Sequence, residues 1–279
     1  MKTKIFLMIT ALALFTFYSC SKQTDIDQTS IDLANDDAVS DAIFEDVFNT
    51  ADNAELILAD FQKGEIAKSS VQDSCPAVSI DHPTDTKWPK VITVDYGTLC
   101  TGFNDNTRSG KIIITVTGPR LQTGSKKTVT FDNYLVNGIK VEGTKVIENL
   151  GLNENQNMVF AVTLTNGQLT LPDGRTIKRS ASHEREWIAG FSTRNIWDDE
   201  CFVTGTATGV TLKGVAFSNT ITSALYWKRA CRFLVSGVVK IEREGQEPVI
   251  LDYGDGECDA FATLTKGDQT REITLKYRR

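Results

Sequence analysis

The sequence contains little of what most enzymes and metal-binding proteins use. Its 279 residues include only two histidines and three methionines, which disfavours histidine-rich metal sites and histidine-based acid–base catalysis. It has no P-loop, no Gly-x-Ser-x-Gly motif and no His-Glu-x-x-His motif, so nucleotide and hydrolase chemistry lack their usual motifs. The Cys-x-x-Cys spacing of zinc sites is also absent. The sequence therefore favours a non-enzymatic protein and leaves enzymatic activity undecided.

The body of the chain also lacks an excess of charge of either sign. Residues 20–63 hold eleven Asp or Glu against two Lys, whereas residues 64–279 hold twenty-five acids against twenty-six bases. A near-neutral body without a basic face gives no reason to expect a nucleic-acid partner. The composition, 41% hydrophobic and 24% charged, is that of a folded protein with one large or two small domains.

Only the N-terminus carries a long apolar run. Two lysines precede residues 5–18, a run that is shorter than the roughly 20 residues of a membrane-spanning helix. The run ends at Ser19-Cys20, which resembles the lipobox of bacterial lipoproteins. The resemblance implies that residues 1–19 are a signal peptide and that Cys20 is lipidated, which anchors a protein stably when two or three acyl chains are attached. The two bulky aromatic residues before Ser19 leave an ordinary signal peptide as the alternative.

Residues 20–35 are predicted to form an acidic tether, because they are polar, lack aromatic residues and have too little apolar surface to fold. Acidic residues close behind a lipidated cysteine resemble the export signal of lipoproteins on the outer face of the Bacteroidota outer membrane. The alternative is a solvated spacer that carries no export signal, because Lys22 and Gln23 separate Cys20 from Asp25. We therefore expect an outer-membrane lipoprotein that faces either the periplasm or the cell surface.

Residues 36–279 are expected to form a single β-rich domain that begins with one helix. From Asp36 to Gly64 the apolar residues recur every three or four positions, which predicts an amphipathic helix of roughly 25 residues. From Trp88 onward apolar and polar residues alternate, which predicts strands. Turn dipeptides of tight hairpins lie among them, at Asn137-Gly138, Asn166-Gly167 and Asp173-Gly174.

The pattern contains at least ten short strands and no second helix of comparable length. Successive hairpins without intervening helices predict a mainly β fold, an antiparallel meander. Ten strands in one sheet curl strongly or split into two sheets. Two arrangements stay open, a two-layer sandwich with the helix in its core and a strongly curled, half-open barrel with the helix inside.

An internal repeat relates residues 75–118 to residues 231–277. Each copy runs from a cysteine through a strand, a polar turn with a proline and a second strand that ends in Asp-Tyr-Gly, and a second cysteine follows. The alignment places Tyr96 and Tyr253 on one strand face, and it places Asp95 and Asp252 on the other. We interpret this agreement as an internal duplication or a structural echo.

The repeat also predicts how the cysteines pair. If each copy is a hairpin, its ends meet, so Cys75 can bond to Cys100 and Cys231 to Cys258 in an oxidising compartment. Cys201 is then left as a buried thiol. It could compete for Cys231 if the predicted strands at residues 201–210 and 228–237 are neighbours.

Several longer motifs resemble one family. They are a lipobox, an acidic helix, ITVDYG with a nearby cysteine, TRSGKIIITVTG, FDNYLVNGIKVEG, EREWIAGF and LDYGDGECD. Together they resemble an uncharacterised family of Bacteroidota lipoproteins with paired Asp-Tyr-Gly and Cys motifs. That family has no assigned activity, so the resemblance gives these residues no role.

Two groups of residues are candidate ligand sites, and no cofactor other than Ca²⁺ is considered. One is an acidic loop with glycine turns, which comprises Asp252, Asp255, Glu257 and Asp259. Its carboxylate oxygens suit Ca²⁺, and the alternative is a structural turn capped by aspartates. The other consists of tryptophans that either stack on sugar rings or belong to the core, namely Trp187, Trp197 and Trp227. The charged residues 183–186 alternate in sign, which is typical of a solvated strand face.

Three functional hypotheses follow from these patterns. The first is a lipid-anchored β-protein of the outer membrane or cell surface with a non-enzymatic binding or structural role. The second is a carrier of an apolar ligand in a cavity between sheet and helix. The third is a glycan-handling enzyme with paired carboxylates, whose clustered candidates are Glu184, Glu186, Asp198, Asp199 and Glu200. The expected partners are the membrane, through the lipid anchor, and a glycan, an apolar ligand or an envelope protein.

Overall fold

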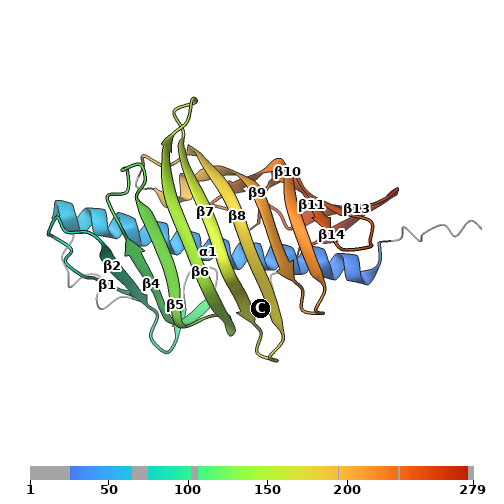
Figure 1. The fold of residues 1–279 in the computed structure, drawn as a ribbon, viewed down its shortest axis with the longest axis horizontal. Helices are drawn as coiled ribbons and strands as arrows, with labels where there is room; N and C mark the ends of the chain where they lie inside the picture. Colours follow the sequence, from blue (N-terminus) through green and yellow to red (C-terminus); the bar gives the residue numbers. More distant parts are fainter. Residues whose placement is uncertain (1–25, 65–74, 102–105, 194, 232, 276–279) are drawn as a thin grey trace, which may run out of the picture.

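The computed structural model describes residues 26–64, 75–101, 106–193, 195–231 and 233–275. Within these ranges the chain forms one long helix and one antiparallel sheet of fourteen strands (Figure 1). Each strand pairs with its neighbours along the chain, with one exception. β2 pairs with β4, and the two-residue β3 between them in sequence pairs only with β4. The predicted mainly β antiparallel meander with one long helix is therefore confirmed. The predicted signal peptide, Cys20 and the first part of the tether lie outside the described residues.

The helix is α1 (Gln28–Lys63), and a single turn of 3-10 helix, η2 (Ile196–Asp198), precedes β9. The strands in chain order are β1 (Ala77–Ile80), β2 (Lys90–Asp95), β3 (Cys100–Thr101), β4 (Thr107–Val116), β5 (Lys126–Val136), β6 (Ile139–Leu152), β7 (Met158–Thr170), β8 (Thr176–Ala189), β9 (Glu200–Val210), β10 (Ala216–Lys228), β11 (Ser236–Glu242), β12 (Val249–Asp255), β13 (Phe261–Lys266) and β14 (Gln269–Thr274).

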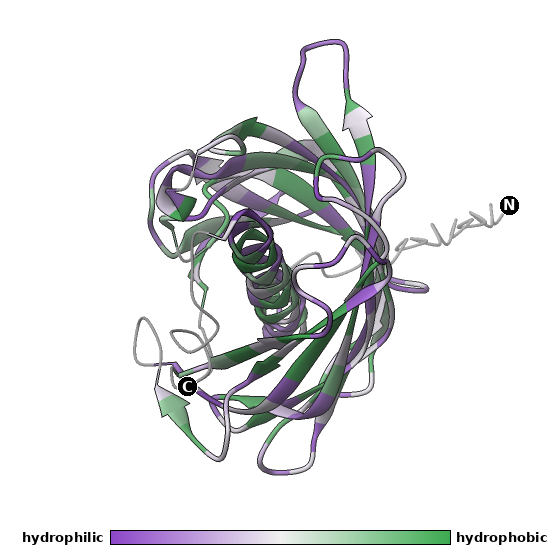
Figure 2. Ribbon diagram, turned by 90° about the vertical axis from the view of Figure 1, so that its left-hand side faces the viewer, coloured by the Kyte–Doolittle hydropathy of each residue, from purple (hydrophilic) through white to green (hydrophobic). Residues whose placement is uncertain are grey.

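The sheet curls around the helix without closing, with β1 and β14 as its edges (Figure 2). Of the two arrangements that the sequence leaves open, the structure has the curled sheet. Bulges bend the long strands at glycines that no other residue could replace without a clash. At Gly143 and Gly205 φ is +124°, and a Cβ at Gly205 would lie 2.2 Å from the carbonyl oxygen of Ser182.

One predicted turn is wrong. Asn137-Gly138 and Asp173-Gly174 do lie between successive strands, but Asn166-Gly167 lies inside β7. There the pairing with β8 shifts register between Leu164 and Gly167, and Asn166 has a φ of +52°. The dipeptide therefore forms a bulge. An Asn-Gly pair indicates left-handed backbone conformation, which a bulge uses as well as a tight turn.

The helix begins eight residues before the predicted start. Its N-terminus is capped by Asp27, whose carboxylate accepts a hydrogen bond of 2.7 Å from the amide of Ser30, and Gly64 ends it with a φ of +73°. Residues 28–35, which we expected in the tether, are therefore helical. They fold because Leu33 and Ala34 are buried among residues of β10–β14, a distant partner that the local sequence does not reveal.

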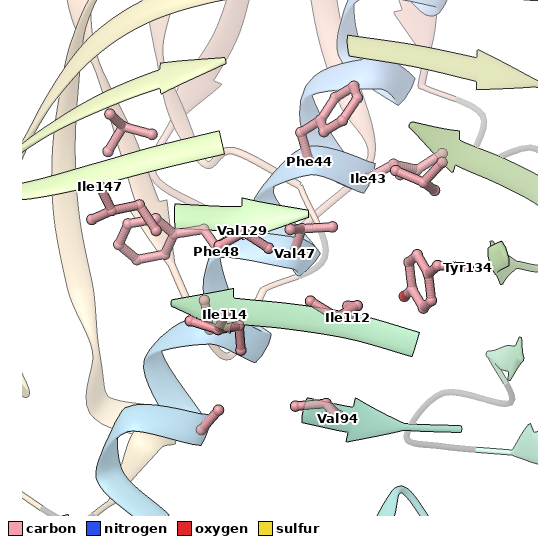
Figure 3. Packing of buried hydrophobic residues seen from close by; sticks show 14 of the residues in the cluster. Ile43, Phe44, Val47, Phe48, Val94, Ile112, Ile114, Val129, Tyr134 and Ile147 are labelled. Carbon is pink, nitrogen blue, oxygen red and sulfur yellow. The ribbon is translucent and has the colours of Figure 1, made fainter. Parts of the chain in front are cut away.

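The core lies between α1 and the concave face of the sheet. A larger cluster packs the middle and C-terminal part of the helix mainly against β1–β8, and a second cluster packs its first turns mainly against β10–β14. Figure 3 shows Val47 and Phe48 of the helix beside Ile114, Val129 and Ile147 of the strands. The helix therefore joins the cores of the two ends of the sheet.

Buried ion pairs also connect the helix to the sheet. The Nζ atom of Lys127 lies 3.2 Å from Asp52 Oδ1 and 2.8 Å from Glu55 Oε2. Burial lowers the pKa of Lys127, but the two carboxylates outweigh this effect and raise it above its ordinary value. Arg179 forms ion pairs with Asp37 and with another acid of the helix. The acidity of residues 20–63 is thus partly matched by cations that point inward from the strands.

Candidate functional site

A cavity of about 750 Å³ lies along α1, between the helix and the two ends of the sheet. One end contributes residues of β1, β2 and β4 to its wall. The other end contributes β8, β9, β10, β12 and the segment that follows β10. Small-molecule sites in proteins have volumes of roughly 300–1,000 Å³, so the cavity is large enough for such a ligand.

The helix presents a polar stripe to the cavity. Asp41, Glu45, Asn49 and Asn53 are four residues apart, which places them on one side of the helix, and all four line the cavity. The apolar residues of Figure 3 lie on the side that packs against the sheet. The sequence analysis used only the apolar stripe, because a polar stripe is ordinarily exposed to solvent.

The two copies of the repeat contribute to the wall in the same way. Tyr96 and Tyr253 are both buried and both line the cavity. In each copy the aspartate before the tyrosine turns to the other face, where it accepts a hydrogen bond from the amide of the glycine. The distance is 2.8 Å from Gly97 to Asp95 and 2.9 Å from Gly254 to Asp252. The Asp-Tyr-Gly motif therefore has an interpretable structural role: the aspartate fixes the turn and the tyrosine faces the cavity.

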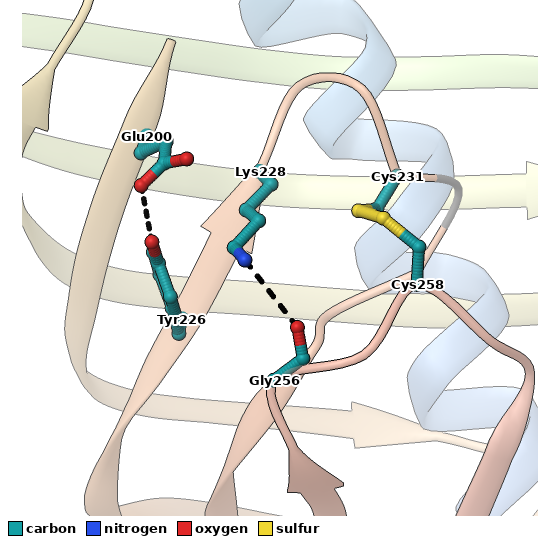
Figure 4. Close-up of a disulfide and its surroundings, with 6 residues drawn as sticks. All are labelled: Glu200, Tyr226, Lys228, Cys231, Gly256 and Cys258. Atoms are coloured by element: carbon teal, nitrogen blue, oxygen red, sulfur yellow. Dashed lines mark hydrogen bonds between the residues drawn. A yellow bond between two sulfur atoms is a disulfide. The ribbon is translucent and has the colours of Figure 1, made fainter. Parts of the chain in front are cut away.

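Both predicted disulfides are present, with Cα atoms 5.8 Å apart for Cys75–Cys100 and 5.2 Å apart for Cys231–Cys258. Cys201 is free and buried. Cys75 and Cys231 line the cavity, so each copy of the repeat is fixed where it forms the wall. Figure 4 shows the second disulfide beside the strand end at Lys228, whose Nζ atom donates to the carbonyl oxygen of Gly256 at 3.3 Å.

Two arginines of the cavity wall are paired with acids of the helix. Arg108 Nη2 donates to both carboxylate oxygens of Asp46, at 2.8 and 2.9 Å. Arg185 Nη2 lies 2.5 Å from Glu45 Oε2. Since each guanidinium already has a carboxylate, these pairs orient the wall and leave it little net charge.

A third arginine, Arg229, is placed differently. Its side chain is only 8% exposed, and its closest carboxylate oxygen, on Asp199, is 4.0 Å from Nη1. That Nη1 atom has no hydrogen-bond partner within the described part of the chain. Burial lowers the pKa of Arg229 despite Asp199, and burial together with the charge of Asp52 raises the pKa of Asp199 to about 6.

Unpaired polar atoms gather around the cavity. Eleven buried side-chain nitrogen or oxygen atoms lack a partner among the described residues, and six of them belong to residues of this wall. These six are Glu45 Oε1, Asn49 Oδ1, Asn53 Oδ1, Arg108 Nε, His183 Nε2 and Arg229 Nη1. Burial lowers the pKa of His183 to about 4, so its ring is neutral at pH 7. Buried polar groups in proteins are nearly always hydrogen-bonded, so this wall is suited to an occupant that both donates and accepts hydrogen bonds.

The three candidate tryptophans have different surroundings. Trp187 is 2% exposed, and its ring contacts those of Phe48, Phe160 and Phe191, so it belongs to the core. Trp227 is buried and lines the cavity. Trp197 also lines the cavity but is 45% exposed, which places it where the cavity meets solvent.

The acidic candidates lie apart from the cavity wall. Asp252 and Asp259 each accept a hydrogen bond from a backbone amide two residues later. No group of three or more His, Cys, Asp or Glu that could hold a metal ion is present in the part of the chain that the structure describes. Of the carboxylates considered for glycan chemistry, Glu186 accepts hydrogen bonds from Asn153 and Asn157, and Glu200 accepts one from a tyrosine hydroxyl.

The interpretation of residues 183–186 as one solvated face is wrong. His183 and Arg185 point inward to the cavity wall, whereas Glu184 is exposed. The strand period could have identified this inward face. Ile177, Arg179 and Trp187 are an even number of residues from His183 and Arg185, and all three are buried. A cation at an inward position was overlooked because its carboxylate partner is on a distant helix. Arg108, whose partner Asp46 is also on the helix, was missed for the same reason.

No protein-family model, curated protein or solved structure matches this chain. Among the residues that are described, no helix has the length and apolar character needed to span a membrane.

Proposed function

We propose that this protein is a lipid-anchored binding protein of the outer membrane, facing the periplasm or the cell surface, that holds a small amphipathic molecule in the cavity along α1. The observation that carries the proposal is the set of six unpaired polar atoms around one cavity of about 750 Å³. Tyr96, Trp227 and Tyr253 supply apolar surface in the same wall. A ligand with both apolar and hydrogen-bonding parts satisfies both kinds of surface.

A purely apolar ligand fits this wall less well, because it would leave the six polar atoms desolvated and unpaired. A glycan-handling enzyme also has less support. The acids of the wall, Asp41, Glu45 and Asp46, each form an ion pair with an arginine. Burial raises the pKa of Asp41, but Arg179 outweighs this and holds it below its ordinary value. A carboxyl held in its ionised form is unsuited to act as the general acid of such an enzyme, and Asp199, whose raised pKa suits that role, is not part of the cavity wall.

The binding proposal can be tested with the uncharged fluorescent probe N-phenyl-1-naphthylamine. The mature lipoprotein is placed in phosphatidylcholine nanodiscs, and the variant Ala42→Trp, which puts an indole into the cavity, is measured in the same discs. The control, Gln62→Trp, puts the same residue at an exposed position of α1. We expect wild type and Gln62→Trp to bind the probe beyond the lipid background and Ala42→Trp to bind at least tenfold more weakly. Equal probe binding by all three proteins would contradict the proposal.

Lipidation is tested at Cys20. The variant Cys20→Ser should remain unprocessed or become soluble, whereas wild type should sediment with the membrane fraction. Maturation of Cys20→Ser with normal sedimentation would refute the lipobox interpretation. Protease accessibility on intact cells then distinguishes a surface-facing protein from a periplasmic one.

A further inference from the structure

The charges of the cavity wall do not all have equivalent surroundings. Arg108 and Arg185 each donate to a carboxylate of the helix at hydrogen-bond distance. Arg229 has a carboxylate only at 4.0 Å, so its Nη1 hydrogens are not taken up by an ion-paired acid. Of the three arginines in the wall, it is the one without a carboxylate at hydrogen-bond distance among the described residues.

The position of Arg229 is fixed by its backbone. Its amide donates to the carbonyl oxygen of Asp199 at 2.9 Å, and Cys231, two residues further on, is held by a disulfide. The side chain is more than nine-tenths buried, which removes most of its hydration. A preorganised, desolvated guanidinium binds an anion more strongly than an exposed one.

Apolar side chains line the same cavity as this cation. Trp227 and Phe233, which precede and follow Arg229 in the chain, both line the cavity and are buried. The partly exposed Trp197 lines it as well. A ligand with its charged end at Arg229 can therefore place an aromatic or aliphatic body along these side chains.

We infer that the ligand is an amphipathic anion, whose single carboxylate, sulfonate or phosphate ester group is bound by Arg229 and whose apolar body lies against Trp227 and Phe233. This inference rests on the proposed binding function and names the class of ligand. The pKa of Asp199, raised to about 6, is consistent with it, because that carboxyl competes weakly for Arg229 in the slightly acidic range.

Two matched probes test the inference. N-phenyl-1-naphthylamine is uncharged, and 8-anilino-1-naphthalenesulfonate is the same ring system with one sulfonate added. Both are titrated against the mature lipoprotein in phosphatidylcholine nanodiscs, with the signal of nanodiscs without protein subtracted as the lipid background. We expect the sulfonate to bind wild type at least tenfold more tightly, the gain of about one charge-assisted hydrogen bond.

The measured quantity is the ratio of the two dissociation constants, which is insensitive to a general loss of binding. Arg229→Gln should bring the ratio close to one. Arg229→Lys keeps the charge and should keep most of the preference, and Arg175→Gln, at an exposed arginine, should leave it unchanged. A ratio near one in wild type, or a ratio that persists in Arg229→Gln, overturns the inference while the binding function stands. Failure of both probes to bind wild type overturns the binding function itself.

Discussion

The two sides of α1 differ in how completely their polar side chains are paired. Toward the sheet, Asp52 and Glu55 share Lys127, and both oxygens of Asp37 accept hydrogen bonds from Asn219 at 2.8 and 2.9 Å. Toward the cavity, the side-chain oxygens of Asn49 and Asn53 have no partner within the described chain. Both sides are polar and both are shielded from solvent, but these acids of the sheet side have partners on the strands, whereas the two amide oxygens of the cavity side do not.

This difference separates structural residues from binding residues. A buried charge whose partner is part of the chain contributes to specifying how the helix sits on the sheet, and removing either partner is costly. A buried polar atom without a partner costs stability and is retained where it binds something else. The comparison therefore predicts large stability effects on the sheet side and small ones on the cavity side.

The largest effect is expected at Lys127. Lys127→Ala removes the closer of the two cations beside Asp52 and Glu55 and leaves them only Arg120, at 3.2 and 3.9 Å, which should lower the free energy of unfolding by about 3–5 kcal/mol in urea titrations. Lys126→Ala, on the opposite face of the same strand and paired with Glu148 at the surface, should cost less than about 1 kcal/mol. Equal losses for the two variants would show that the sheet-side ion pairs are not structural.

The disulfides are expected to contribute next. Closing loops with sequence separations of 25 and 27 residues should stabilise the fold by about 3 kcal/mol each, so Cys75→Ala/Cys100→Ala and Cys231→Ala/Cys258→Ala should lose similar amounts. Thermal unfolding under non-reducing conditions measures the loss. Because both hairpins form cavity wall, both double variants should also weaken probe binding. A variant that loses stability and keeps full binding would contradict the assignment of its hairpin to the wall.

A pH effect should appear at Asp199. Its pKa in the folded state is about 6, against 3.8 for the ordinary group, so the fold favours the protonated form. The stabilisation is complete below pH 3.8 and is lost as the pH rises through 6. Relative to Asp199→Asn, wild type should therefore lose about 1–3 kcal/mol of unfolding free energy between pH 4 and pH 7. The neighbouring variant Asp198→Asn is the control, and a difference that is flat with pH at Asp199 would disprove the shift.

The smallest effect is expected on the cavity side. Asn53→Leu removes an unpaired oxygen and introduces a better helix former, so stability should change by less than about 1 kcal/mol in either direction. Asn219→Leu, which takes a partner from the buried Asp37, should cost about 1–3 kcal/mol. A large loss at Asn53 in urea titrations would mean that the cavity side is structural too.

Much of the fold could be predicted because its signals are local. The strand period, two of the three turn dipeptides and the paired cysteines each concern residues close in sequence, and these predictions are confirmed for the class of fold and for both disulfides. The start of the helix could not be predicted, since Leu33 is buried by strands more than 180 residues away.

The candidate site was harder to predict for the same reason. Arg108, Arg185 and Arg229 come from three parts of the chain, and of the three only Arg185 has a signal near it in sequence, the strand period of its buried neighbours. They line the same cavity beside α1 only because the sheet curls around the helix. The tryptophans were recognisable as a set, but which of them reach the cavity depends on strand ends that the pattern does not place.

Contacts within the sheet and contacts of the helix span very different distances along the chain. Along the main path, each strand pairs only with its sequence neighbours, so the sheet has low contact order for a β protein and each hairpin closes a short loop. The contacts of α1 reach much further, from Asp46 to Arg108 and from Asp37 to Asn219. The chain entropy lost in long-range ordering is therefore concentrated in one event, the docking of the helix. The cavity wall, which includes the helix, is complete only once that event has taken place.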